Sequence, residues 1–545
     1  MRTTGRGTMF IETRQAEAEA AAAEAEEGGG GGGDISSLIP VYHTARDISY
    51  AQVGTCDVLN GDMAGGWTLT PHHHYDLGGQ TLFLGNGSVV KATPVKTPAC
   101  VFSNIQISAT GTLSIVSRDG AELYLFDADG RHLRTYDTLL GAVEYAFGYD
   151  ANGRLISIVD KFSNTTSVQR AGSGEATNIV SPFGVRTQLL MDDNGYLSAV
   201  VNPANETNAF RYSANGLLTN VITRKGYVFS FVYDEWGRLV RAEDPAGAYH
   251  QFKRENFFAG HEVMDSGTLQ GSNTYRFARM GADFSLRTHV APGNLTTLTY
   301  QNYAETIITN IAPDGTVVST LMGADPRFDW QVKKPEMRTI RFPSGLIWSA
   351  NVSRAASLSD TGDVLSLVSF TNVFSINDRP AYVASYQASN RMASLTSPEG
   401  RTRRVIYNAN GRAERIELPG LYPIDVAYDV HGRLQQFAIG TGAVRRAFGL
   451  GYTTNGFWGA LTNSLLQSYR LDSDPAGRVT NLLQPDAKTI GLRYDKSSNL
   501  GGVRRPIRLN IRWTTTTLVF WVAIRPPAWL VWTRIFSSRG MRAAR

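Results

Sequence analysis

Short runs of alternating apolar and polar residues, separated by turn residues, fill most of the chain from about residue 126 to about residue 500. Residues 209–233 show the pattern, with an apolar run ending at Tyr212, a turn at 213–216, a run at 217–223, a turn at 224–226 and a run at 227–233. Alternation of period two, with Asn-Gly or Asp-Gly between the runs, is typical of β-hairpins. The pattern predicts an all-β protein built from repeated hairpins.

A heptapeptide of the form Tyr-Asp-x-x-Gly-Arg-Leu recurs with a period of 21 residues. It is clearest at Tyr149–Leu155 and Tyr233–Leu239, and weaker copies begin at Phe126, Met191, Tyr212, Tyr386, Tyr407, Tyr428, Ser473 and Tyr494. A fixed period of this length is typical of a stacked repeat architecture. We expect the motif residues to serve the fold rather than chemistry; they are Tyr149, Asp150, Gly153, Arg154, Tyr212, Gly216, Tyr233, Asp234, Gly237, Arg238, Tyr407, Gly411, Arg412, Tyr428, Asp429, Gly432, Arg433, Tyr494 and Asp495.

Each class of motif residue has a predicted mechanical role. Glycine tolerates the positive φ that tight hairpin turns need. Tyrosine ends a strand, where its ring can stack on the equivalent ring of the next hairpin. Arginine opens the return strand and can pair with the aspartate or bond to turn carbonyls. Pro-x-Gly segments, as at Ser397–Gly400, are predicted to make the turn at the opposite end of the hairpin.

These residues resemble the YD repeat of the RHS and teneurin family, whose proteins wind a long chain of hairpins into a hollow β-shell. The resemblance covers residues 126–500, and Gly66–Ser88 resembles the stretch that leads into such shells. It implies a shell here, in a protein that is exported or displayed at the cell surface. The stretch 254–373 has lost the motif but still alternates, as at Arg338–Phe342, so we place it inside the shell.

We expect four segments. Residues 1–33, which are rich in Ala and Glu and end in six glycines, form a disordered leader, and residues 34–125 form a β-rich segment leading into the shell. The shell itself spans 126–503. The tail at 504–545 is rich in Trp and Arg and keeps no repeat pattern, so we interpret it as an out-of-frame or truncated end. A membrane-surface anchor is the alternative.

Charge and cysteine content narrow the function classes. The net charge of +5 becomes −4 when the nine arginines of residues 504–545 are left out, so the body lacks the basic footprint of a nucleic-acid-binding protein. Cys56 and Cys100 form either a disulfide or two separate thiols, and their spacing does not decide between these. The first 14 residues lack the apolar run of a signal peptide.

Candidate chemistry is sparse. The chain has neither a GxSxG elbow nor a P-loop, and His261-Glu262 lacks the second histidine of a zinc-protease helix. His72 and His74 could share a strand face, which supplies two metal ligands at most. Aspartate-rich turns such as Asp127–Gly130 offer too few oxygens for calcium. We therefore expect no catalytic, cofactor-binding or metal-binding residues.

Some members of the family release a C-terminal toxin inside the shell by self-cleavage at an Asp-Pro-x-Gly segment. Asp244–Gly247 and Asp474–Gly477 match those letters, but both lie where the repeat places its own turns. The roughly 42 residues that end the chain are also too few for an independent toxin domain.

The leading hypothesis is a non-catalytic, structural β-shell of an exported or surface protein, which encloses a cargo. A module for adhesion that binds a cell-surface glycan or protein is the second hypothesis, and a toxin-delivery cocoon without its toxin is the third. The partners implied are such a glycan or protein, or an encapsulated C-terminal polypeptide. No nucleic acid is expected, and membrane contact is expected only through the tail.

Overall fold

One antiparallel sheet of 37 strands, β10–β46, makes up almost all of the molecule. The structure, a computed structural model, describes residues 67–85, 112–268 and 271–505, together with short strands outside these ranges. Every strand of the large sheet pairs with the strands that precede and follow it in sequence. The prediction of an all-β protein made of successive hairpins is confirmed.

The first part of the sheet carries the regular repeats. Its strands are β10 (Gln106–Ile107), β11 (Leu113–Val116), β12 (Glu122–Phe126), β13 (His132–Asp137), β14 (Ala142–Tyr149), β15 (Leu155–Asp160), β16 (Thr165–Arg170), β17 (Ala176–Val180), β18 (Arg186–Met191), β19 (Leu197–Val201), β20 (Thr207–Tyr212), β21 (Leu218–Ile222), β22 (Val228–Tyr233) and β23 (Leu239–Glu243).

Longer strands follow in the stretch that has lost the motif. They are β24 (Tyr249–Phe257), β25 (Gly260–Gly267), β26 (Asn273–Met280), β27 (Phe284–Ala291), β28 (Leu295–Asn302), β29 (Ile307–Ile311), β30 (Val317–Asp325), β31 (Asp329–Arg341), β32 (Ile347–Leu358), β33 (Leu367–Ile376) and β34 (Arg379–Gln387). All of them continue the same sheet, so this stretch is no separate insertion.

Regular repeats then resume. The strands are β35 (Met392–Thr396), β36 (Thr402–Tyr407), β37 (Ala413–Glu417), β38 (Ile424–Tyr428), β39 (Leu434–Ile439), β40 (Arg446–Tyr452), β41 (Trp458–Thr462), β42 (Ser468–Ser473), β43 (Val479–Leu483), β44 (Thr489–Tyr494), β45 (Leu500–Arg504) and β46 (Asn510–Ile511), with single 3₁₀ turns at η4 (Ala388–Asn390) and η5 (Gly442–Val444).

Small sheets precede the large one. They contain β1 (Ile11–Thr13), β2 (His43–Ala45), β3 (Ile48–Tyr50) and β4 (Trp67–Leu69), then β5 (His74–Asp76), β6 (Thr81–Phe83) and β7 (Val89–Lys91), and finally β8 (Lys96–Thr97) and β9 (Cys100–Val101). The side chains of Cys56 and Cys100, most of the leader and most of the tail lie outside the described residues. The predictions about them therefore stay predictions.

Each hairpin has two kinds of turn, and both use the same local geometry. At the turn after a Tyr-Asp motif, which we call a YD turn, Gly216 has φ +81° and its N–H donates to the Ser213 carbonyl. The register then shifts between Arg211 and Tyr212, which is the bulge expected for this hairpin loop. At the other end, in what we call a return turn, Gly184 has φ +76° and donates to the Ser181 carbonyl.

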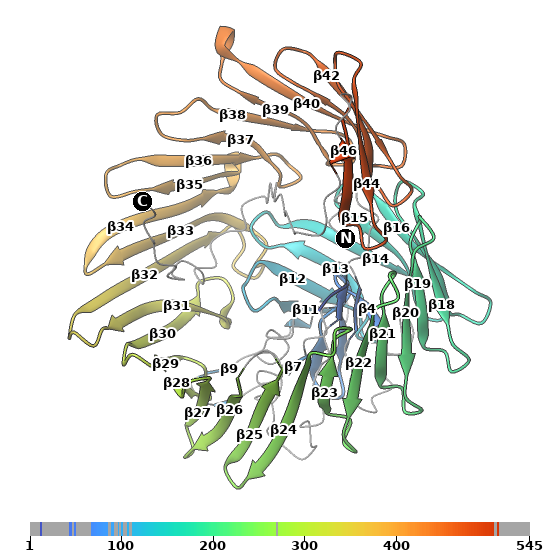
Figure 1. Cartoon of the computed structure of the whole chain (residues 1–545). Coiled ribbons are helices and arrows are strands. Elements are labelled where there is room, and N and C mark those ends of the chain that lie inside the picture. Colours follow the sequence, from blue (N-terminus) through green and yellow to red (C-terminus); the bar gives the residue numbers. More distant parts are fainter. Residues whose placement is uncertain are drawn as a thin grey trace, which may run out of the picture.

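The sheet coils so that its late strands return beside its early ones (Figure 1). Glu206, just before β20, pairs with Arg478, just before β43, and Lys225, just before β22, pairs with Asp495, just after β44. The hydrogen bonds that Asn164 and Glu206 make across this junction join residues 267 to 272 positions apart in sequence. We call β11–β22 the first coil, β30–β45 the second coil and the line where they meet the seam.

The hydrophobic core lies on one face of the first coil. Leu189, Val200 and Phe210 are buried there together with Trp67 and Leu69 of β4. The segment 67–85 thus packs on the sheet as a second layer, and its Tyr75 and Leu82 join a further cluster with Leu113 and Phe126. Smaller clusters join the two coils, as where Val332 packs beside Val116.

Candidate functional site

Along the seam, each return turn of the first coil contacts one YD turn of the second coil. The turn at 161–164 lies against that at 429–433, the turn at 181–185 against that at 453–457, and the turn at 202–206 against that at 474–478. The turn at 223–227 follows, because Lys225 forms an ion pair with Asp495 at 2.5 Å. Closure of the coil therefore uses one pair of docked turns for each of these repeats.

Two phenylalanines of the first coil fill spaces between successive YD turns. Phe162 lies against Gly432, and the Arg412 guanidinium of the preceding YD turn is 4.9 Å from the centre of its ring. Phe183 repeats this arrangement with Gly456 and with Arg433, which is 4.6 Å away. A Cβ atom at either glycine would overlap the ring. Glycine is thus required by the approach of the ring as well as by φ.

Polar contacts complete the seam. Asn164 donates to the His431 carbonyl at 3.0 Å, and the His431 ring bonds to the Asn164 side chain at 2.7 Å. Further along, Glu206 of the first coil pairs with Arg478 at 2.9 Å and with Arg224 at 3.2 Å. These three side chains are largely buried, so removing one partner would leave a charge without its partner in a poorly solvated place.

Aspartate and arginine of the motif organise each YD turn before it docks. Asp234 Oδ1 accepts the N–H groups of Trp236 and Arg238, and its Oδ2 accepts Arg238 Nε at 2.8 Å. Asp150 with Arg154 and Asp429 with Arg433 do the same. Asp474 of the Asp-Pro-Ala-Gly segment also follows this pattern, so that segment is a YD turn.

Tyrosine hydroxyls of the motif link one repeat to the one before it. Tyr212 donates to the Leu197 carbonyl at 2.6 Å, Tyr233 to that of Leu218 at 2.7 Å, and Tyr428 to that of Ala413 at 2.9 Å. In each case the acceptor is the seventh motif residue of the preceding copy. The sequence motif predicts ring stacking for these tyrosines, and no local pattern in it indicates this ladder of hydroxyl bonds.

Segment 67–85 binds to the same tyrosines. Trp67 Nε1 donates to the Tyr212 hydroxyl at 2.8 Å, and its ring lies 4.7 Å from that of Phe210. His72 Nε2 is hydrogen-bonded to the Tyr149 hydroxyl at 2.7 Å. The motif tyrosines therefore hold this segment on the sheet as well as joining the repeats.

A stack of buried histidines anchors the segment. His73 lies on His132 with ring centres 4.9 Å apart, and Tyr124 and Phe147 enclose the pair. His132 Nδ1 accepts the His73 backbone N–H, and His73 Nδ1 accepts that of Gly85. Both Nδ1 atoms must therefore be unprotonated. Burial lowers the pKa of His73 to about 3 and, with the nearby histidines, places the pKa of His132 well below its usual value.

The arrangement differs from the expectation for this histidine run. His72 and His73 are buried and precede β5, so His72 and His74 do not form the pair on one strand that the sequence suggested. Within the described ranges, no three His, Cys, Asp or Glu side chains gather as they would to hold a metal ion. The described part of the chain also has no helix with the length and apolar character needed to cross a membrane.

The seam predicts unequal effects at two motif glycines. Gly432→Ala and Gly195→Ala both place a side chain at a left-handed φ, which costs about 1 kcal/mol. Only the first also meets a ring, since Gly195 has open space around it. We expect Gly432→Ala to lose about 1–3 kcal/mol more in free energy of unfolding, measured by chemical denaturation. Equal losses would contradict the docking of Phe162.

The histidine stack predicts acid sensitivity. Because the folded pKa of His73 is depressed, its contribution to stability is complete above about pH 6.5 and is lost as the pH falls toward 3. At pH 5 the loss is about 2 kcal/mol for this residue. Hydrogen exchange in residues 67–85 should therefore speed up between pH 7.5 and pH 5, after correction for intrinsic rates. Unchanged protection would show that the stack does not control docking.

Comparison with known proteins agrees with this geometry. The family model described as Teneurin YD-shell matches residues 110–517. No curated protein sequence matches the chain.

Among solved structures, that of TcdB2-TccC3-Cdc42 is similar over 74% of this chain and 22% of its own, at 11% identity and a TM-score of 0.35. The Tc holotoxin pore of Photorhabdus luminescens is similar over 70% and 24%, at 12% identity and a TM-score of 0.24. The chain thus spans about a quarter of the length of these structures. Because both TM-scores are below 0.5, the assignment to a family rests on the family model alone. The chain belongs to the teneurin YD-shell family.

Proposed function

We propose that this chain is the wall of a non-catalytic container, which keeps a polypeptide cargo away from solvent and proteases. The observation that carries the proposal is the seam, where each return turn of the first coil fits a YD turn one coil later. Figure 1 shows one sheet coiled so that its late strands return beside its early ones, which is the arrangement a wall around a space requires.

The motif residues support a structural role over a catalytic one. The side chains of Asp234 and Arg238 bond to each other within their own turn, and the Tyr233 hydroxyl donates to a backbone carbonyl. Polar residues of the seam, such as Glu206 and Arg478, pair with each other. Side chains that are neutralised by each other are poor acids, bases or nucleophiles, whereas such pairing suits a wall.

Export or surface display fits a container whose wall must survive without chaperones. The continuous ladder of β10–β46 pairs nearly all backbone groups within one sheet, and the seam covers one row of turns of the first coil. Such a wall limits the exposed strand edges that promote aggregation. The limited exposure of strand edges and the membership of the family both support a secreted or cell-surface location, which we include in the proposal.

Protease protection tests the container directly. An unstructured reporter peptide fused to the C-terminus should resist trypsin in the wild-type protein and be digested in a variant with an opened seam, Phe162→Asp with Phe183→Asp. The matched control, Phe258→Asp, changes a fully exposed phenylalanine that lies away from the seam. Digestion of the reporter at the same rate in all three proteins would contradict a container.

A further inference from the structure

The coiled wall has two rows of turns that take no part in the seam. The seam joins return turns of the first coil to YD turns of the second coil, so the other turns of these two coils lie at opposite edges. The open YD edge consists of the first-coil turns at 127–131, 150–154, 171–175, 192–196, 213–217 and 234–238. The open return edge consists of the second-coil turns at 397–401, 418–423, 440–445, 463–467 and 484–488.

Apolar side chains gather on the open return edge. Large hydrophobic residues of three successive turns are more than half exposed there, namely Leu421, Tyr422, Val444, Leu465 and Leu466. Terminal repeats of a stacked architecture normally carry polar side chains on their outer face. An edge with this many exposed apolar side chains is therefore typical of an interaction surface.

Two leucines at the tip of the turn at 463–467 support this interpretation. Leu465 has the position in its turn that Phe183, which docks in the seam, has in its own turn, yet Leu465 is 75% exposed. Leu466 is 84% exposed and has φ +61°, where Gly184 has φ +76°. A leucine in the left-handed region strains the backbone, and such strain is retained mainly where function uses it.

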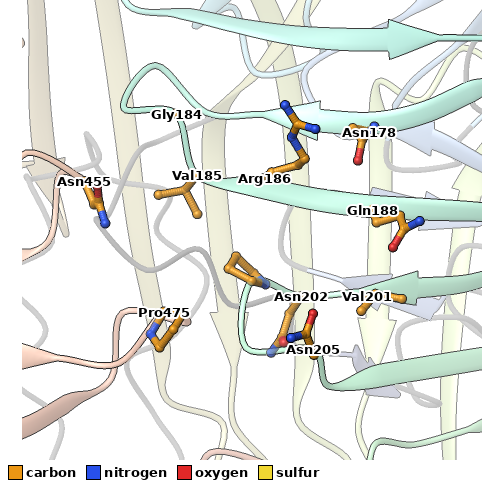
Figure 2. A pocket seen from close by; sticks show the side chains of 11 residues that line it. Asn178, Gly184, Val185, Arg186, Gln188, Val201, Asn202, Asn205, Asn455 and Pro475 are labelled. Carbon is orange, nitrogen blue, oxygen red and sulfur yellow. The ribbon is translucent and has the colours of Figure 1, made fainter.

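The seam shows how a row of return turns binds a row of YD turns. In Figure 2, Gly184 and Val185 of a return turn lie across from Asn455 and Pro475 of two YD turns. Successive hairpins of either row are two strands apart, roughly 10 Å, so two such rows can meet repeat by repeat. The open YD edge has the same spacing, and Gly195 on it has open space beside it.

Charges on the two open edges are complementary. The turns of the open YD edge contain more acidic than basic residues, and Asp193 and Glu235 are exposed at its tips. The turns of the open return edge contain more basic than acidic residues, and Arg445 is exposed there beside the exposed Arg446. Such complementarity favours contact between unlike edges over contact between like edges.

We propose that the open return edge of one copy of this chain docks on the open YD edge of a second copy, so that copies stack end to end. The contact is head-to-tail and repeats between copies the arrangement that the seam has within one copy. Leu465 then enters the space between YD turns that Phe183 fills in the seam. This assembly goes beyond the container role, because it concerns how many copies form the wall and not what the wall encloses.

Sedimentation velocity of the full chain over a range of concentrations tests the proposal. We expect the wild type to associate reversibly, and less as salt screens the charged edges. Leu465→Asp with Leu466→Asp should weaken association at least about tenfold, because it brings two charges into the contact. Leu321→Asp changes an exposed leucine in the middle of β30, away from both edges, and should leave association unchanged.

A mixing experiment separates a head-to-tail contact from a two-fold one. Asp193→Arg with Glu235→Arg alters the open YD edge only. Each double variant should be monomeric where the wild type associates. An equimolar mixture of the two should form a dimer and nothing larger, because each variant contributes one intact edge.

Three results would overturn the proposal. They are a wild type that is monomeric at every concentration, unchanged association in the leucine double variant, and a dimer of the YD-edge variant alone, which would show two return edges in contact. Circular dichroism separates misfolding from a lost contact, and Arg445→Glu with Arg446→Glu gives a second measurement if the leucine variant is unstable. The reporter-protection assay alters only the seam within one copy, so its outcome is independent of this one.

Discussion

Closure of the coil depends on how near two turns can approach each other. A ladder of hairpins satisfies its own backbone groups strand by strand, and its twist determines how many strands make one coil but not how closely the turns of two coils approach. Gly432 and Gly456 lack the side chain that would keep Phe162 and Phe183 away, and the guanidinium groups of Arg412 and Arg433 cover the other side of each ring. Each of these glycines thus has two roles, since it adopts the positive φ of the turn and leaves space for a ring of the other coil.

The motif therefore acts at two levels. Within a repeat, aspartate and arginine fix the turn, and the tyrosine hydroxyl bonds to the preceding repeat. Between coils, the arginine covers an aromatic ring from the other side of the seam. Segment 67–85 adds a third level, since Trp67 and His72 use the hydroxyls of Tyr212 and Tyr149 to cover the sheet. The same few motif residues thus serve the turn, the link between repeats and the seam.

Local features could be read from the sequence, and distant ones could not. Alternation and Asn-Gly or Asp-Gly signals placed the hairpins, since their causes lie within a few residues. The glycine partners of Phe162 and Phe183 are about 270 residues away, and their identity depends on the number of strands in a coil, which twist and curvature determine. His132 was missed as the partner of His73 for the same reason, because no local pattern marks a buried imidazole.

Cross-linking across the seam tests the coiled wall most directly. Lys225 and Asp495 form an ion pair at 2.5 Å although they belong to different coils. A zero-length carbodiimide reagent should join them by an amide bond, which mass spectrometry of the tryptic digest would identify in the monomer. We expect this cross-link at high yield and its loss when Phe162→Asp with Phe183→Asp opens the seam. A monomer without it would contradict closure by docked turns.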